Sequence, residues 1–128
     1  MRILGKEFVQ HYLGRMLNIH PSLLPKYTGL NTHQRVLENG DSTHGASIHF
    51  VTTELDGGPV VIQVEVPVLR DDDAGRLAAR VLQQEHNLYR QAIQWFAEHR
   101  LKLIDGKAYL DGEKLQQPQI LETVEQDT

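Results

Sequence analysis

The chain has 128 residues, 40% of them hydrophobic and 23% charged, and this mixture predicts one compact domain with a modest core. Its formal net charge of −4 argues against a broad nucleic-acid-binding surface, although it is compatible with a single phosphate pocket. The chain contains no cysteine, which excludes disulfides and thiolate zinc ligands and fits a cytoplasmic location, and no apolar run approaches membrane-spanning length.

The first part of the chain alternates short elements with turn residues. Apolar residues at helical spacing predict a helix over 6–13. Residues 15–20 are typical of a short strand, and segment 21–30, with two prolines and a glycine, is typical of a loop. Thr32 is then expected to act as the N-cap of a short helix that runs through Glu38.

Two strands are expected next. Alternating apolar residues predict one strand over 45–52 and a second over 60–68, joined by the turn-rich sequence "ELDGGP". Pro67 cannot donate a ladder hydrogen bond, so the end of the second strand is expected at a sheet edge. The three aspartates at 71–73 then favour the start of a long helix, because carboxylates suit the positive end of the helix dipole.

A helical projection divides the long helix into two sides. The apolar side chains on one side are Leu77, Val81, Leu82, Leu88, Ala92, Ile93 and Phe96. The polar side chains that are expected to face away are Gln83, Gln84, Arg90, Gln91 and Gln94. Glu85 falls in the middle of the apolar side, where a carboxylate is costly unless something pairs with it. Either the helix presents Glu85 to a polar ligand, or a buried cation or hydroxyl group holds it.

The C-terminal region contains one clear turn. Asp105 and Gly106 lie between short apolar segments and predict a β-hairpin. From Gln116 onward the chain is polar and is expected to fray. The chain therefore divides into a folded part, 1–115, and a polar tail, 116–128, and the mixture of elements predicts an α+β or α/β fold.

Asn18 and His20 are the first candidates for chemistry. Side chains two apart on a strand share a face, so these two would project together just before Pro21. An asparagine amide can donate to a developing oxyanion, and a histidine can transfer a proton near neutral pH. The N-x-H pattern is weak, however. Spacing alone favours the simpler interpretation that both side chains satisfy backbone groups of the loop.

Asp56 is a second candidate, in the sequence "LDGG". Local sequence favours a turn-forming role, because Asp-Gly is a standard turn pair. A functional role would require Asp56 to approach His20, where its carboxylate would favour the imidazolium form. Neither H-x-x-E-H nor H-E-x-x-H spacing occurs, so no metal site is expected.

Five segments together resemble a known family. "MRIL", "LNIHPSLLPKYTG", "THG", "HFVTTELDGGPV" and "QEHNLY" occur in the order and spacing typical of the bacterial, folate-dependent glycinamide ribonucleotide formyltransferases of purine biosynthesis. The resemblance implies an α/β fold, the C-terminal part of a formyltransferase-like open mixed sheet with flanking helices and a C-terminal β-hairpin. It also implies 10-formyltetrahydrofolate as the formyl donor, small-molecule substrates, and no metal, nucleic-acid or membrane partner.

The resemblance assigns three catalytic roles. In the family the substrate amine attacks the formyl carbon directly and forms a tetrahedral intermediate. By this resemblance Asn18 donates to the oxyanion, and His20 stabilises charge and moves a proton to the leaving folate nitrogen. Asp56 holds and polarises His20.

The resemblance also implies two binding regions. The folate-binding residues would be Met1, Arg2, Ile3, Leu4, Val9, Met16, Asn18, Val51, Thr52, Thr53, Glu54, Leu55 and Asp56. The ribonucleotide-binding residues would be Leu82, Gln83, Gln84 and Glu85. Glu85 would bind the ribose hydroxyls, which would explain its place in the apolar arc. The segment 26–33 resembles the mobile lid of the family.

The chain departs from the family in two ways. Asn31 stands where many members have histidine, so the lid is expected to respond differently to pH. Family members also carry an N-terminal half with a glycine-rich phosphate loop, whereas the resemblance aligns Met1 and Arg2 with an internal Met-Arg of the family. The expectation is a C-terminal part of the enzyme from a truncated gene, a split gene or an incomplete gene call, and another chain is one source of the N-terminal half. Two other functions stay open: a non-catalytic remnant or subunit, and a formyltetrahydrofolate hydrolase, against which a ribose-binding Glu85 would argue.

Overall fold

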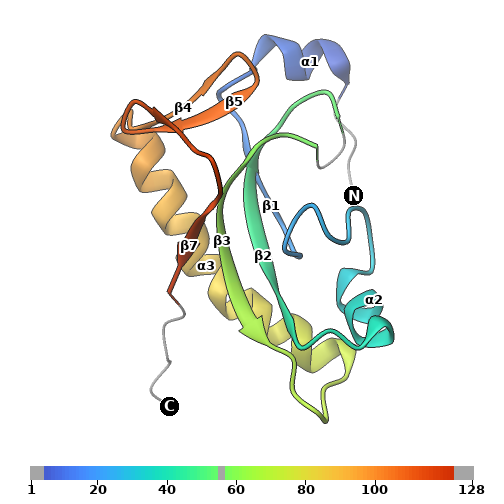
Figure 1. Cartoon of the computed structure of the whole chain (residues 1–128). Helices are drawn as coiled ribbons and strands as arrows, with labels where there is room; N and C mark the ends of the chain where they lie inside the picture. Colours follow the sequence, from blue (N-terminus) through green and yellow to red (C-terminus); the bar gives the residue numbers. More distant parts are fainter. Residues whose placement is uncertain (1–4, 55–56, 123–128) are drawn as a thin grey trace.

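The computed structural model describes residues 5–54 and 57–122. Its helices are α1 (Lys6–His11), α2 (Thr32–Asn39) and α3 (Ala74–Ala97). Its strands are β1 (Leu17–His20), β2 (Thr43–Phe50), β3 (Val60–Pro67), β4 (Leu101–Ile104), β5 (Lys107–Leu110), β6 (Glu113–Lys114) and β7 (Gln119–Leu121). The expected α/β class, the flanking helices and the C-terminal hairpin are confirmed (Figure 1).

The main sheet has the strand order β1-β2-β3-β7. β1 pairs antiparallel with β2, and β2 pairs antiparallel with β3, while β3 and β7 run parallel, so the sheet is mixed as expected. The expectation of a frayed tail from Gln116 was wrong for residues 119–121. Their backbone groups pair with residues 62–64 of β3, and Ile120 and Leu121 give this short segment two apolar side chains within an otherwise polar tail.

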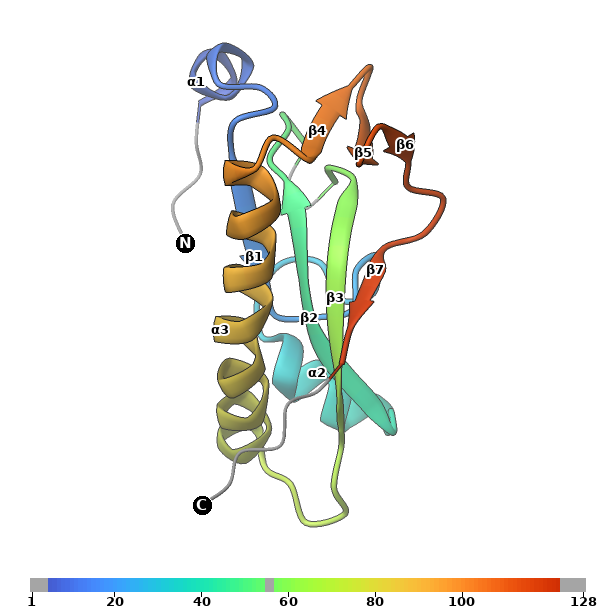
Figure 2. The ribbon, with the colours of Figure 1, turned by 90° about the vertical axis from the view of Figure 1, so that its left-hand side faces the viewer.

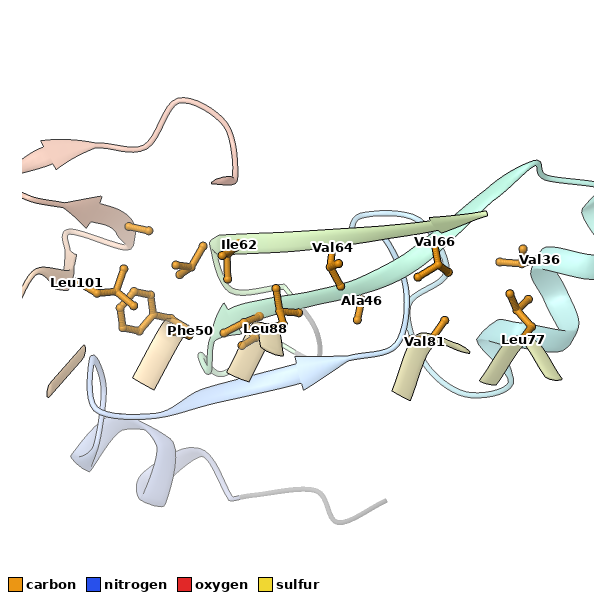
Figure 3. Packing of buried hydrophobic residues seen from close by; sticks show 14 residues of the cluster. Val36, Ala46, Phe50, Ile62, Val64, Val66, Leu77, Val81, Leu88 and Leu101 are labelled. Carbon is orange, nitrogen blue, oxygen red and sulfur yellow. The ribbon is translucent and has the colours of Figure 1, made fainter. Parts of the chain in front are cut away.

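Helix α3 covers one face of the main sheet, and β4, β5 and β6 form a second, smaller sheet beyond its C-terminal end (Figure 2). The core lies between α3 and strands β2 and β3 (Figure 3). Phe50, Ile62 and Val64 from the strands pack there with Leu77 and Leu88 from α3. Because α3 and the core occupy one face of the main sheet, the opposite face is lined by other side chains.

The buried stripe of α3 differs from the predicted one. It comprises Leu77, Val81, Gln84, Leu88 and Ala92. These residues repeat every three or four positions, so the stripe is narrower than the predicted arc and is centred near Gln84. Gln84 is only 4% exposed, whereas Leu82 and Ile93 are 53% and 41% exposed. The prediction was wrong for these three residues, and Glu85 flanks the stripe.

Local geometry fixes the ends of several elements. The α2 N-cap is Asn31 (φ 58°), whereas the predicted cap, Thr32, is the first helical residue and its hydroxyl donates to the Pro21 carbonyl. The expected hairpin joins β4 and β5 through Asp105 and Gly106, both with positive φ (51° and 76°). Such a pair of angles suits a tight two-residue turn, which explains why Asp-Gly was a reliable signal.

Candidate active site

The two candidate residues of β1 lie on the face of the sheet opposite α3. In the antiparallel register Asn18 faces His49, and His20 faces Ser47. Ser47 in turn faces Gln63 of β3. Directly opposed residues point to the same side of a sheet, so all five side chains share this face, which we call the polar face. The prediction that Asn18 and His20 project together is therefore met by the strand geometry.

Asn18 is exposed and contacts a buried histidine. Its Nδ2 lies 3.4 Å from Nε2 of His49, which is itself 3% exposed. Nδ1 of His49 donates to the Phe50 carbonyl oxygen at 2.9 Å. A carbonyl can only accept, so the neutral His49 ring presents Nε2 as an acceptor to the Asn18 amide. The amide has a second N–H, which an oxyanion could use.

His20 is buried, and the loop that follows it fixes one of its nitrogens. Its Nε2 donates to the carbonyl oxygen of Tyr27 at 2.8 Å, and the side chain is 3% exposed. The Tyr27 hydroxyl donates to Asp41 at 2.6 Å. Arg35 lies over the Tyr27 ring, 5.3 Å from its centroid. The neutral ring therefore carries its proton on Nε2, and Nδ1 is its basic nitrogen.

A buried hydroxyl holds the same loop to the sheet. Ser47 Oγ donates to the Ser22 carbonyl at 2.7 Å and accepts from the Leu24 amide at 3.0 Å. Gln63 Nε2 lies 3.0 Å from that hydroxyl and donates to the Leu24 carbonyl at 2.8 Å. The Ser22 hydroxyl donates to the Lys26 carbonyl at 2.6 Å. Sequence reasoning assigned no role to Ser47 or Gln63; the signal for Gln63 was its place in the apolar run "VVIQVEV".

The predicted folate segment between β2 and β3 adjoins the start of β1. The Val51 amide donates to the Met16 carbonyl at 3.0 Å, and the Gly57 amide donates to the Glu54 carbonyl at 3.3 Å. Thr53 and Glu54 are exposed. Of the other predicted residues, Val9 is buried on α1, while Val51, Met16 and Thr52 are half-buried.

Six predicted site residues lie outside the described part of the chain. They are Met1, Arg2, Ile3, Leu4, Leu55 and Asp56. The predicted pairing of Asp56 with His20 therefore stays a prediction.

The residues of the predicted ribonucleotide-binding segment lie on different sides of α3 and differ in burial. Leu82 and Gln83 are exposed, while Gln84 is buried, and its Oε1 accepts from Asn87 at 3.5 Å. Glu85 is half-buried, and burial raises its pKa, whereas the charges of His86 and His20 act to lower it.

His33 of α2 and His44 of β2 form a histidine pair. Nδ1 of His33 and Nε2 of His44 share a hydrogen bond of 3.0 Å, with their rings edge to face. Burial lowers the pKa of His33. Burial, followed by the nearby His33, lowers the pKa of His44 to about 4. Both rings are therefore neutral at pH 7.

Three further observations bound the site. Over residues 5–54 and 57–122, no group of three histidine, aspartate or glutamate side chains could hold a metal ion. Within the same ranges, no helix is long and apolar enough to cross a bilayer. A surface groove lined by residues of the 110–120 segment contains none of the predicted site residues.

Comparison with known protein families identifies the class to which this polar face and sheet topology belong. The family described as formyl transferase matches residues 1–93, and the chain belongs to this family.

Particular relatives narrow the class. The chain is 59% identical over 115 residues to phosphoribosylglycinamide formyltransferase of Escherichia coli strain K12, which covers 90% of this chain and 54% of that protein. The solved phosphoribosylglycinamide formyltransferase of Coxiella burnetii superimposes with a TM-score of 0.88 at 48% identity, over 94% of this chain and 57% of that one. The chain thus spans about half the length of the relatives it matches.

A more distant structure carries a different name. A formyltetrahydrofolate deformylase from Pseudomonas syringae superimposes with a TM-score of 0.81 at 28% identity, over 86% of this chain and 37% of that one.

Proposed function

We propose that this chain carries the formyl-transfer chemistry of a phosphoribosylglycinamide formyltransferase. The reaction would move a formyl group from 10-formyltetrahydrofolate to the amine of glycinamide ribonucleotide in purine biosynthesis, in the cytoplasm. The observation that carries the proposal is the pair Asn18 and His20 side by side on the polar face, with an exposed amide next to a buried imidazole. The 59% identity to a relative of that name supports the choice of acceptor.

The proposed chemistry follows from these side chains. Attack of the substrate amine on the formyl carbon forms a C–N bond and places negative charge on the formyl oxygen, towards which Asn18 would direct its second N–H. Collapse breaks the bond between the formyl carbon and the folate nitrogen. His20 would return the proton lost by the amine to that nitrogen, and Asp56 would stabilise the imidazolium meanwhile. Neither a metal nor a covalent enzyme intermediate enters this balance.

The binding regions are part of the same proposal. Segment 51–56, with Val9 and Met16, would hold the folate, and segment 1–4 would complete that pocket. Segment 82–85 would face the ribonucleotide, with Glu85 on the ribose hydroxyls. Glu85 and exposed Gln83 support this assignment most directly, since buried Gln84 could contribute only after a rearrangement.

We also infer that an N-terminal half, on the same or another polypeptide, completes the enzyme. Among the described strands β1 has one neighbour, β2, and its outer edge is therefore available for pairing. An open edge next to two candidate catalytic residues is a natural position for further strands.

The test is a reconstitution assay. The chain is assayed alone and with the separately expressed N-terminal half of the Escherichia coli relative, with 10-formyltetrahydrofolate and with or without glycinamide ribonucleotide. Formyl transfer that requires the ribonucleotide supports the proposal. Formate release without it would establish the hydrolase alternative, and absence of both reactions in the reconstituted protein would favour a non-catalytic remnant or subunit.

A further inference from the structure

We propose that Gln63 is a positioning residue for His20, acting through the loop segment 21–27. The inference rests on the proposed function only in so far as His20 is the proton-transfer group. Gln63 lies on β3, two strands away from β1, and its side-chain amide donates to the Leu24 carbonyl and to Ser47 Oγ. Its influence has to pass through the hydrogen bonds that hold the loop.

The first step is the anchor at the start of the loop. Gln63 Nε2 donates to the Leu24 carbonyl at 2.8 Å and reaches Ser47 Oγ at 3.0 Å. Leu24 is 4% exposed and Ser47 is fully buried. A buried carbonyl that loses its donor is costly, so without Gln63 the Leu24 carbonyl would be driven towards water.

The second step runs along the segment itself. The hydroxyl of Ser47 holds both the Leu24 amide and the Ser22 carbonyl, at 3.0 and 2.7 Å. The Ser22 hydroxyl then donates to the Lys26 carbonyl at 2.6 Å. A displacement of Leu24 is therefore passed to Lys26, the residue directly before Tyr27.

The third step reaches the imidazole. The Tyr27 carbonyl accepts from His20 Nε2 at 2.8 Å and so selects the tautomer with the proton on that nitrogen. If this carbonyl moves, the ring can rotate and the two neutral tautomers become more nearly equal. A proton-transfer group needs one orientation, because small misplacements of such a group cost rate. Gln63 thus fixes which nitrogen of His20 is basic.

Nuclear magnetic resonance of the intact chain tests this inference without any activity. The variants are Gln63→Met, which keeps the length and removes both N–H donors, and Ser47→Ala, which removes the hydroxyl at the centre of the network. Gln94→Met is the matched control, because Gln94 is exposed near the end of α3. The measurements are the ¹⁵N shifts of the His20 ring and the exchange rates of the Leu24 and Lys26 amides.

In both variants we expect exchange of the loop amides to rise about tenfold, in line with the loss of one or two buried hydrogen bonds. The His20 ¹⁵N shifts should move towards a mixture of tautomers, while amides of β2 and β3 stay protected and Gln94→Met resembles the wild type. If the loop loosens but the His20 shifts do not move, Gln63 is only a structural anchor and the inference fails. Unchanged loop exchange and shifts in a folded Gln63→Met protein would also overturn it.

Activity of the reconstituted enzyme adds a separate readout. Gln63→Met should lower kcat about tenfold with KM within about twofold, because orientation of His20 affects the reaction step more than binding. If the wild-type protein transfers no formyl group, the proposed function fails, while the ring shifts still decide whether Gln63 positions His20.

Discussion

Individual polar residues in this protein have environments that set their charge. Glu85 flanks the buried stripe of α3, and partial burial raises its pKa. His33 and His44 form a neutral pair between α2 and β2, and His49 presents an acceptor to Asn18. Each of these environments has a measurable consequence for stability.

Replacement of Glu85 by glutamine should stabilise the isolated chain at pH 7. The native carboxyl binds its proton more tightly than the unfolded one, so its ionisation opposes folding above the native pKa. The difference in melting temperature between Glu85→Gln and wild type should shrink as the pH falls through the native pKa towards 4.5. Glu7→Gln, an exposed change on α1, is the control. A destabilised Glu85→Gln protein at pH 7 would mean that the carboxylate has a favourable partner.

His44 should make the fold sensitive to acid. Its native pKa of about 4 lies below the unfolded value of about 6.5, so the unfolded chain takes up the proton first. The stability that follows from this difference in pKa is fully present above pH 6.5 and is lost as the pH falls towards 4. The loss amounts to up to about 3 kcal/mol in the free energy of unfolding. Denaturant titrations of wild type, His44→Gln and the exposed-site control His11→Gln would measure it. An equal pH dependence in wild type and His44→Gln would contradict the assignment.

At the scale of the elements, periodicity identified the strands and helices better than it identified their faces. Strand alternation and the Asp-Gly turn depend on local sequence, so β2, β3 and the β4–β5 hairpin were predictable. The face of α3 was misjudged because the packing partner decides which stripe is buried, and a buried Gln84 carries no apolar signal. β7 was missed for a similar reason: its pairing with β3 depends on the folded sheet.

The candidate site shows the same limit. Asn18 and His20 could be placed on one face from their spacing, but their partners His49, Ser47 and Gln63 come from register, which the sequence does not reveal. The contact between the Tyr27 carbonyl and His20 was equally hidden, because it depends on the conformation of the loop.

Gly45 tests the close pairing of β2 and β3. A Cβ built at this position would lie 1.9 Å from the Val64 carbonyl oxygen and 2.9 Å from Leu23 Cδ2. Gly45→Ala should therefore destabilise the chain by at least about 2 kcal/mol, because the strand backbone has to move. Gly5→Ala is the control, since no atom lies within 4 Å of its built Cβ. A change below about 0.5 kcal/mol in chemical denaturation of Gly45→Ala would show that the strands are less closely paired.

At the scale of the whole molecule, the main sheet formed by the described strands ends in β1, which carries Asn18 and His20. The core lies on the α3 side, so the candidate site depends on a strand with one described neighbour. If an N-terminal half pairs with that edge, it would hold the two candidate catalytic side chains as well as complete the proposed binding surface.

Hydrogen exchange tests this arrangement. Addition of the N-terminal half of the Escherichia coli relative should slow exchange of β1 amides by about tenfold or more, because they gain strand pairing. Amides of β4 and β5, in the smaller sheet, should change little and provide an internal control. Protection confined to the small sheet, with none on β1, would show that the partner binds elsewhere.

The proposed chemistry is tested most directly by the rate of formyl transfer in the reconstituted protein carrying His20→Ala, Asn18→Ala or Asp56→Asn, beside the exposed control His11→Ala. If an amide, an imidazole and a carboxylate act together on the formyl carbon, each of the first three changes should lower kcat about 100-fold or more, with the fold intact and His11→Ala unaffected. Folded His20→Ala protein with a kcat within about twofold of wild type would show that His20 does not transfer the proton.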